Sequence, residues 1–232
     1  MPTTFSDILT GAVMQDIDDV RWQQQLEENP ALFFRSKSQV LINSIPRFNK
    51  PPEMEAYLAY DAPAYDDYTF VIENEPIMPY VVHTHKTGFD LASAITVIRE
   101  ANAVKTCRLD IDYDPETGRV QFNAPMLQQG QEIEIDFYTD GTFVNDLTVR
   151  QQRILGMCVA YDWYRQFAGT YLGITPKVID PKFKVNGTES GKIRADTERM
   201  NYLEAQLNGE LNNYERACAY AKRVPSGKHI YP

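Results

Sequence analysis

Two closely spaced histidines are the first side chains in this sequence that could do chemistry. His83 and His85 flank Thr84, and in an extended strand residues i and i+2 point to the same face, so both imidazoles could bind one metal ion. Zinc normally takes three or four protein ligands, and the remaining histidine is His229, far along the sequence. We therefore expect no metal site. An acidic hydrolase that uses a carboxylate pair near these histidines is the weakest functional hypothesis.

Three aspartates at alternate positions have the spacing of the first ligands of a calcium-binding loop. They are Asp110, Asp112 and Asp114. The pattern fails at the sixth position, which is Pro115 instead of glycine, and at the twelfth, which is Gln121 instead of glutamate. We expect these carboxylates to share the solvent face of a strand.

No recognised catalytic motif is present in the sequence. There is no phosphate-binding glycine loop, no Gly-x-Ser-x-Gly motif and no cysteine beside a histidine. Cys107, Cys158 and Cys218 are too few and too widely spaced for a disulfide framework or a zinc ligand set, so we expect reduced thiols. The sequence thus predicts a protein that is not an enzyme and binds no cofactor.

A basic stretch stands out from the otherwise acidic chain. Residues 177–194 carry a net charge of +3, whereas the whole chain carries −9. The stretch falls in residues 169–193, which show no regular period and are long for a connection inside a compact domain. We expect an arm over residues 173–194 that orders against a neighbouring subunit. The candidate interaction residues are Tyr171, Lys177, Lys182, Lys184, Lys192 and Arg194.

A strand followed by a long helix joins the two parts of the chain. Residues 132–138 alternate charged and apolar side chains, which predicts a half-buried strand, and Asp140-Gly141 predicts a turn after it. A helical period begins at Thr148 and lasts about twenty residues, with Thr148 and Gln151 spaced as a capping box. Because this helix is apolar on several sides, we expect neighbours all round it.

Further helices are predicted at both ends of the sequence. Residues 16–28 favour a helix capped by Asp16 or Asp18, and Asn29-Pro30 ends it and begins a second helix that stops before Pro46. Residues 195–222 favour a helix with a narrow apolar seam suited to one partner helix. That seam consists of Met200, Leu203, Leu207, Leu211, Tyr214, Cys218 and Ala221.

The middle of the sequence favours short strands. Residues 68–72 and 80–82 are predicted strands, and residues 89–101 fit either a strand or a helix, with strand slightly favoured. The segments 105–113 and 119–123 flank a hairpin turn at 114–118. The predicted fold is α+β, with a helical bundle from residues 1–56 and 146–232 and an inserted antiparallel, sandwich-like β domain over residues 57–145.

Composition limits the classes of partner. A net charge of −9 and a pI of about 4.9 argue against broad binding to nucleic acid or membrane surfaces by the whole chain. No apolar run approaches the roughly 18 residues that span a bilayer, and the first residues do not match a signal peptide. The chain has 14 tyrosines, many of them in the β-rich region. This favours, as an alternative function, a β module that binds carbohydrate or peptide on a helical scaffold.

Three short phrases of the sequence are residues 29–35, NPALFFR, residues 45–52, IPRFNKPP, and residues 137–148, FYTDGTFVNDLT, the last of which leads into the long helix. These phrases resemble neck or head–tail connector proteins of tailed bacteriophages, including adaptor and head-completion types. The resemblance covers both helical ends and the strand-to-helix seam but no residue-level site, and the middle strands match nothing in that class.

The resemblance implies a non-enzymatic virion subunit. Such a protein is made in the host cytoplasm, forms a homo-oligomeric ring that is usually twelvefold at the adaptor level, and contacts portal or tail components. It has no membrane partner and meets packaged DNA only incidentally. Neither the ring size nor the position in the neck follows from the sequence.

Overall fold

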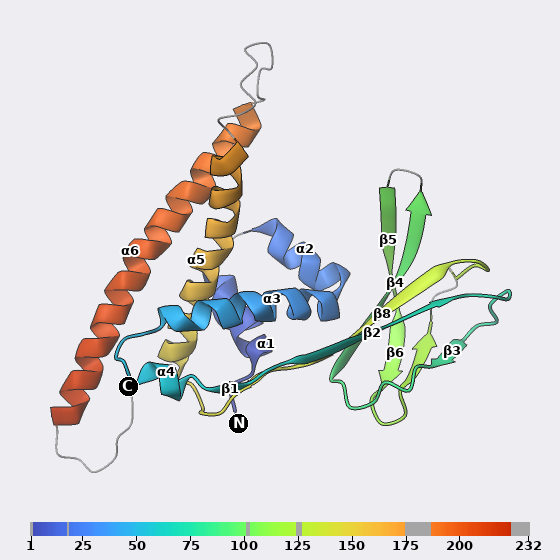
Figure 1. Ribbon diagram of the computed structural model, residues 1–232, viewed down its shortest axis with the longest axis horizontal. Helices are drawn as coiled ribbons and strands as arrows, with labels where there is room; N and C mark the ends of the chain where they lie inside the picture. The colour runs from blue at the N-terminus through green and yellow to red at the C-terminus, as the bar shows by residue number, and fades with distance from the viewer. Residues whose placement is uncertain (1, 18, 101–102, 124–126, 175–186, 224–232) are drawn as a thin grey trace. The chain divides into compact units, whose positions relative to one another are not determined.

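The computed structural model describes residues 2–17, 19–100, 103–123, 127–174 and 187–223. As the sequence predicts, the protein is α+β, with antiparallel sheets and helices (Figure 1). It contains two compact units. The helical unit comprises Met1–Asp18, Gln39–Tyr60 and Phe143–Pro232, and the β unit comprises Asp19–Ser38 and Asp61–Thr142.

The expected division at residues 56 and 145 differs from these units chiefly at residues 19–38, and by a few residues at 57–60 and 143–145. Residues 19–38 were expected in the helical module, but in the structure they group with the strands. The reason is side-chain bonding: Asn29 and Ser38 form hydrogen bonds with Asp136 and Tyr138 of the sheet. The inserted β-rich domain over residues 57–145 stays a prediction.

Short helical segments begin the helical unit. They are α1 (Phe5–Asp7), the π-helix η1 (Ile8–Ala12) and the 3-10 helix η2 (Val13–Gln15), and later segments of the same unit are the 3-10 helix η3 (Ile45–Arg47) and α4 (Met54–Tyr57). Gly156 of the long helix faces η1, and a Cβ atom there would lie 2.7 Å from the Ala12 carbonyl carbon. The two backbones therefore meet at a distance that only glycine permits.

Helix α5 (Val149–Ile174) is the centre of the helical unit. The predicted capping box is confirmed: the Thr148 backbone N–H donates to Gln151 Oε1 at 2.7 Å, and the Gln151 N–H donates to Thr148 Oγ1 at 3.3 Å. The expectation of neighbours on several sides is also confirmed, since buried positions run all round the helix. They are Ile154, Leu155, Met157, Cys158, Val159, Ala160, Tyr161, Trp163 and Tyr164.

Helix α6 (Gly187–Arg223) packs along α5 (Figure 1). The predicted seam is confirmed for Leu203, Leu207, Leu211, Tyr214 and Cys218, all buried, whereas Met200 is half-buried and Ala221 exposed. Gln151 Nε2 donates to the Tyr214 hydroxyl at 2.8 Å inside the seam.

The irregular segment expected over 169–193 is too long, because α5 continues to Ile174 and α6 already starts at Gly187. Once a helix has nucleated, each further residue gains a hydrogen bond, which outweighs the cost of single glycines.

Helices α2 (Val20–Glu28) and α3 (Pro30–Ser44) precede the strands. The cap predicted at Asp16 or Asp18 is wrong: Asp19 accepts from the Arg21 N–H at 2.9 Å, while Asp16 ends η2 and Asp18 lies outside the described residues. The start of α3 is as predicted. Asn29 Oδ1 accepts from the Leu32 N–H at 3.0 Å, and Pro30 occupies the first helical position.

The β unit contains a four-stranded sheet and a three-stranded sheet. The first has the order β2-β8-β4-β5, with β2 Ala64–Val71, β4 Leu91–Glu100, β5 Ala103–Leu109 and β8 Glu132–Thr139. The second has the order β3-β7-β6, with β3 Tyr80–His83, β6 Ile111–Asp114 and β7 Arg119–Phe122. All the pairings within these two sheets are antiparallel, and the segment 89–101, which fitted either structure, contains β4.

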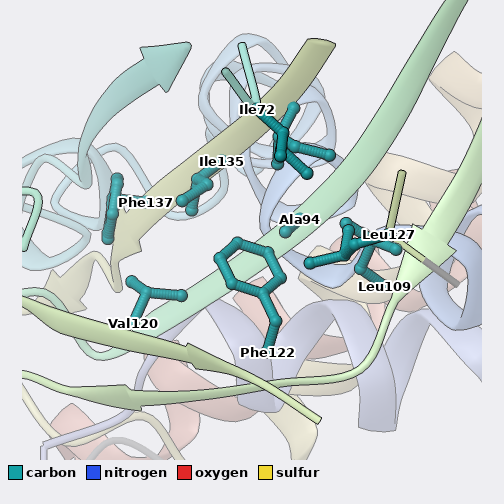
Figure 2. Close-up of a cluster of buried hydrophobic side chains, with 9 residues drawn as sticks. Ile72, Ala94, Leu109, Val120, Phe122, Leu127, Ile135 and Phe137 are labelled. Carbon is teal, nitrogen blue, oxygen red and sulfur yellow. The ribbon is translucent and has the colours of Figure 1, made fainter. Parts of the chain in front are cut away.

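The two sheets share one apolar core. Figure 2 shows the cluster, to which Ile72, Ala94, Leu109, Val120 and Phe122 contribute fully or almost fully buried side chains. The run 105–113, expected as one strand, is two: β5 pairs with β4 in one sheet, and after Asp110 β6 pairs with β7 in the other. The chain therefore changes sheets at Asp110, which sequence alternation alone does not reveal because Leu109 and Ile111 keep the same period.

Two predicted turns have different outcomes. The hairpin turn at 114–118 is confirmed, with Gly118 at φ +67°, and a Cβ atom there would lie 2.9 Å from the Lys86 backbone. Asp140 and Gly141 form no turn: they connect β8 to the short strand β9 (Thr142–Phe143), which pairs with β1 (Tyr60–Asp61). Strand β8 is half-buried only at its start, since Asp136 and Tyr138 are buried on the face opposite the core.

Candidate functional site: a sheet with two open edges

Most of the residues predicted for interaction cannot be placed in a site. Lys177, Lys182 and Lys184 lie outside the described residues. Tyr171 falls in α5 and Lys192 in α6, with no description of their side chains. Arg194 is exposed on α6, and its guanidinium Nε lies 2.8 Å from Glu198 Oε1 one turn further on. Among the six, Arg194 alone has a described side chain, so the predicted interaction set stays a prediction.

The histidines and aspartates match the predicted strands only in part: His85 follows the end of β3 with φ +59°, and Asp110 lies between β5 and β6. His83 ends β3, and both His83 and His85 are exposed. Asp110 and Asp112 are exposed, and Asp114 accepts from the Thr117 hydroxyl at 2.6 Å and the Glu116 N–H at 3.0 Å. These bonds lower the Asp114 pKa and hold the hairpin turn. Across the described ranges, no three metal-ligating side chains lie together.

The tyrosines of the β-rich region do not form one exposed face. Tyr68 and Phe70 of β2 pack against the apolar core, and the Phe70 ring stacks on Tyr80 with the centroids 6.4 Å apart. Tyr60 packs against Phe5 at 5.4 Å. Tyr65 is exposed, and the Arg35 guanidinium lies 4.8 Å from its ring centroid. Apart from Tyr65, these aromatic rings pack within the fold and do not form a flat, exposed aromatic surface.

Strand β5 is the first open edge of the four-stranded sheet. It pairs with β4 on one side and has no strand on the other within the described part of the chain. All five residues from Val104 to Arg108 are exposed, so this part of the strand is covered on neither face, whereas Leu109 at its end is buried in the apolar core. Its end also reaches past the sheet, because Ile98, Arg99 and Glu100 of β4 pair with β5 but not with β8. An uncovered edge of this kind can accept another strand by backbone hydrogen bonding.

Strand β2 is the opposite open edge of the same sheet. It pairs with β8 alone in the ranges that the structure covers. Asp67 is exposed, and Asp66 is half-buried with Oδ2 at 2.5 Å from Lys86 Nζ. The β5 edge, in contrast, carries Lys105 and Arg108, and Arg108 also donates to the Glu27 carbonyl. The two edges of one sheet thus differ in charge, with acidic side chains on β2 and basic ones on β5.

A buried polar cluster holds α3 on the central strands between these edges. Asn29 Nδ2 donates to Asp136 Oδ2 of β8 at 2.9 Å, and Ser93 of β4 donates to Asn29 Oδ1. Burial raises the pKa of Asp136, while the Asn29 hydrogen bond and the nearby Arg35 lower it. The cluster thus joins β8 and β4 to the start of one helix.

Sequence reasoning missed the open edges. Strand existence was predictable, but an edge is defined by the order of strands in a sheet, and order depends on pairing between distant segments. One signal was present: residues 104–108 contain a single strongly apolar side chain, Val104, against Lys105 and Arg108. A strand without an apolar face is typical of a sheet edge.

Comparison of the chain with family models, curated proteins and solved structures finds no match. A separate finding concerns membranes: none of the helices in the described ranges combines the length and apolar character that a bilayer crossing requires.

Proposed function

We propose that this chain is a structural subunit of an oligomeric ring in the neck or head–tail connector of a tailed bacteriophage. The observation that supports the proposal best is the four-stranded sheet with two open edges, β2 and β5. A monomeric protein normally protects such edges because they pair readily with other chains. A subunit with two different open edges can bind one neighbour on each side, as a ring requires.

The phrases that resemble connector proteins fall at element junctions, where sequence and local structure are most closely linked. Residues 29–35 form the cap and first turns of α3, residues 45–52 include η3, and residues 137–148 include the end of β8, β9 and the cap of α5. The proposal therefore draws on likeness at these junctions together with the open sheet.

The proposed partners are further copies of this chain and the portal or tail components that adjoin a connector. The virion is the proposed location. The basic stretch 177–194 suits an acidic partner surface or incidental contact with packaged DNA, because its net charge of +3 is opposite to that of the rest of the chain.

The carbohydrate- or peptide-binding module stays a prediction that no contact in the structure favours. Its expected sign was a set of coplanar exposed tyrosines. Of the aromatic residues Tyr57, Tyr60, Tyr65, Tyr68 and Phe70, only Tyr65 is exposed.

Native mass spectrometry and negative-stain electron microscopy of the purified full chain test the proposal. We expect a ring-sized oligomer, formed either spontaneously or on a portal-like template. A protein that remains a monomer at every concentration and on every such template would contradict the ring subunit. Binding to a glycan array by that monomer would instead support the alternative module.

A further inference from the structure

We infer that neighbouring subunits join by pairing the β5 edge of one copy with the β2 edge of the next, which extends the four-stranded sheet from subunit to subunit. This inference rests on the proposed ring function and names the interface that the ring would use. The occupant of each edge is therefore a second copy of this chain. It concerns the β unit alone.

The strand directions suit this pairing. All neighbours in the order β2-β8-β4-β5 are antiparallel, so β5 runs opposite to β2. When a second copy is placed beside the first in a head-to-tail manner, its β2 lies next to β5 and is antiparallel to it. Antiparallel pairing thus continues across the interface without a change of sense, and the outward backbone groups of both strands can bond.

The alternation of the side chains limits the register. On β5 the odd residues, including Leu109, face the apolar core, whereas on β2 the even residues, including Tyr68 and Phe70, do so. A continuous face across the joint requires odd residues of β5 opposite even residues of β2. One such register places Leu109 opposite Ala64 and Ala103 opposite Phe70, and it pairs the whole of β5 with β2.

This register also brings opposite charges together on both faces. Lys105 lies diagonally across from Asp66 on the face of the apolar core. Arg108 lies diagonally across from Asp67 on the other face. Arg108 and Asp67 are both exposed in the single chain. Cross-strand pairs of opposite charge stabilise a sheet, and like charges destabilise it.

The same charges disfavour pairing between identical edges. Two copies of β5 would bring Lys105 and Arg108 of one chain near those of the other, and two copies of β2 would do the same with Asp66 and Asp67. A head-to-tail contact is therefore favoured over a two-fold one. Head-to-tail contacts produce rings when the rotation closes.

The register implies a tilt of the strands in the ring. Within one sheet Leu109 is level with Ala94, Ile135 and Tyr68, so pairing Leu109 with Ala64 displaces the next copy by four residues along the strand. That displacement is roughly 13 Å at about 3.3 Å per residue. A closed ring accommodates it when the strands tilt from the ring axis, as in β-barrels.

A cysteine introduced in β2 tests the register in the full-length protein. Cys107 of β5 is exposed and lies opposite Asp66 in the inferred pairing, whereas Cys158 and Cys218 are buried. Directly opposed residues of antiparallel strands have Cα atoms about 4.5–5.5 Å apart, within the range of a disulfide. With a mild oxidant, Asp66→Cys is expected to give a ladder of covalent dimers, trimers and larger species on a non-reducing gel.

Two matched variants control the experiment. Thr69→Cys lies on the same strand and is exposed, but it faces the other way and lies about 10 Å from position 66, so we expect no ladder. Asp66→Cys combined with Cys107→Ala should give none either.

Rings that assemble without the ladder would overturn the strand pairing while leaving the ring proposal intact. Covalent dimers without larger species would indicate a two-fold contact instead, and a protein that never forms rings would overturn both proposals.

A charge exchange tests the pairing independently of cysteine chemistry. Arg108→Glu and Asp67→Arg are each expected to weaken ring assembly about tenfold, because like charges then meet across the joint. The double variant should restore assembly, since the reversed charges again complement each other. A double variant that assembles no better than either single variant would overturn the inferred contact. Arg216→Glu, an exposed charge reversal on α6, serves as the control and should assemble normally.

Discussion

Asn29 connects three parts of the β unit through one side chain. Its Oδ1 accepts from the Leu32 N–H at the start of α3 and from Ser93 on β4, and its Nδ2 donates to Asp136 on β8. The helix cap and the attachment of the helix to the sheet therefore depend on the same residue. A cap residue alone contributes about 1 kcal/mol, and here the buried Asp136 carboxylate also depends on it.

Asp136→Asn is expected to stabilise the protein at neutral pH and not at low pH. Burial raises the folded-state pKa of Asp136 above its unfolded value, so the folded state binds more protons and stability falls as the pH rises through that interval. Asparagine keeps an oxygen that can accept from Asn29 but carries no charge. We expect a gain of about 1 kcal/mol in the free energy of unfolding at pH 7, which disappears below about pH 4.

Urea unfolding at pH 7 and at pH 3.5 measures this difference. Asp110→Asn, at an exposed position, is the matched control and should change stability little at either pH. An equal gain at both pH values would mean that the effect does not come from ionisation of Asp136. Asn29→Ala should have the opposite effect at pH 7, a loss of about 3 kcal/mol, because it leaves the buried carboxylate without its amide donor.

At the scale of elements, local chemistry was predictable and pairing was not. The Thr148–Gln151 capping box, the Asn29-Pro30 junction and the turn ending at Gly118 all follow from residues within a few positions of each other. The break at Asp110 does not, because β5 and β6 keep one alternation while joining different sheets. The burial of Asp136 does not follow from local residues either, because its hydrogen-bond partner Asn29 is 107 positions away in the sequence.

For the candidate site, too, local residues were predictable from the sequence and strand pairing was not. The acidic and basic residues of β2 and β5 were visible in the sequence, but only the strand order shows that they occupy opposite edges of one sheet. The predicted basic arm was defined by charge and lack of period. Both ends of this predicted arm are helical in the structure, since α5 ends at Ile174 and α6 begins at Gly187.

Two glycines in helices of the helical unit should respond oppositely to alanine. Gly156→Ala places a methyl group 2.7 Å from the Ala12 carbonyl carbon, so η1 and α5 must separate, and we expect a loss of about 1–3 kcal/mol. Gly209→Ala on α6 meets nothing within 4 Å and should gain about 1 kcal/mol from helix propensity. Thermal unfolding followed by circular dichroism measures both variants. A stabilising Gly156→Ala would show that the close approach of η1 to α5 is not required.

At the scale of the whole molecule, charge bears on how copies of the chain would meet in the proposed ring. The chain is acidic overall, and its basic side chains on β5 are set against acidic ones on β2 at the other edge of the same sheet. A net charge of −9 makes copies repel each other at long range. Assembly of the proposed ring would then depend on short-range contacts at which the local charges are opposite, which favours the head-to-tail orientation.

Salt should act on the ring in two opposite ways, because it screens the long-range repulsion between copies and also the cross-strand pairs at each joint. Each joint in the inferred pairing has two cross-strand charge pairs, and exposed pairs contribute about 0.2–1 kcal/mol each, so screening them should raise the dissociation constant of a joint roughly 2- to 30-fold. Sedimentation velocity at 50 mM and 1 M salt measures the change, since the Debye length falls to about 3 Å at 1 M. The variant Arg108→Gln with Asp67→Asn lacks one pair but keeps the net charge of −9, so its dissociation constant should rise less with salt than that of the unchanged protein. An equal salt dependence of the two proteins would contradict the charge pairs and indicate an apolar joint, for which exposed Val71, Ile77 and Val104 would be the first residues to replace.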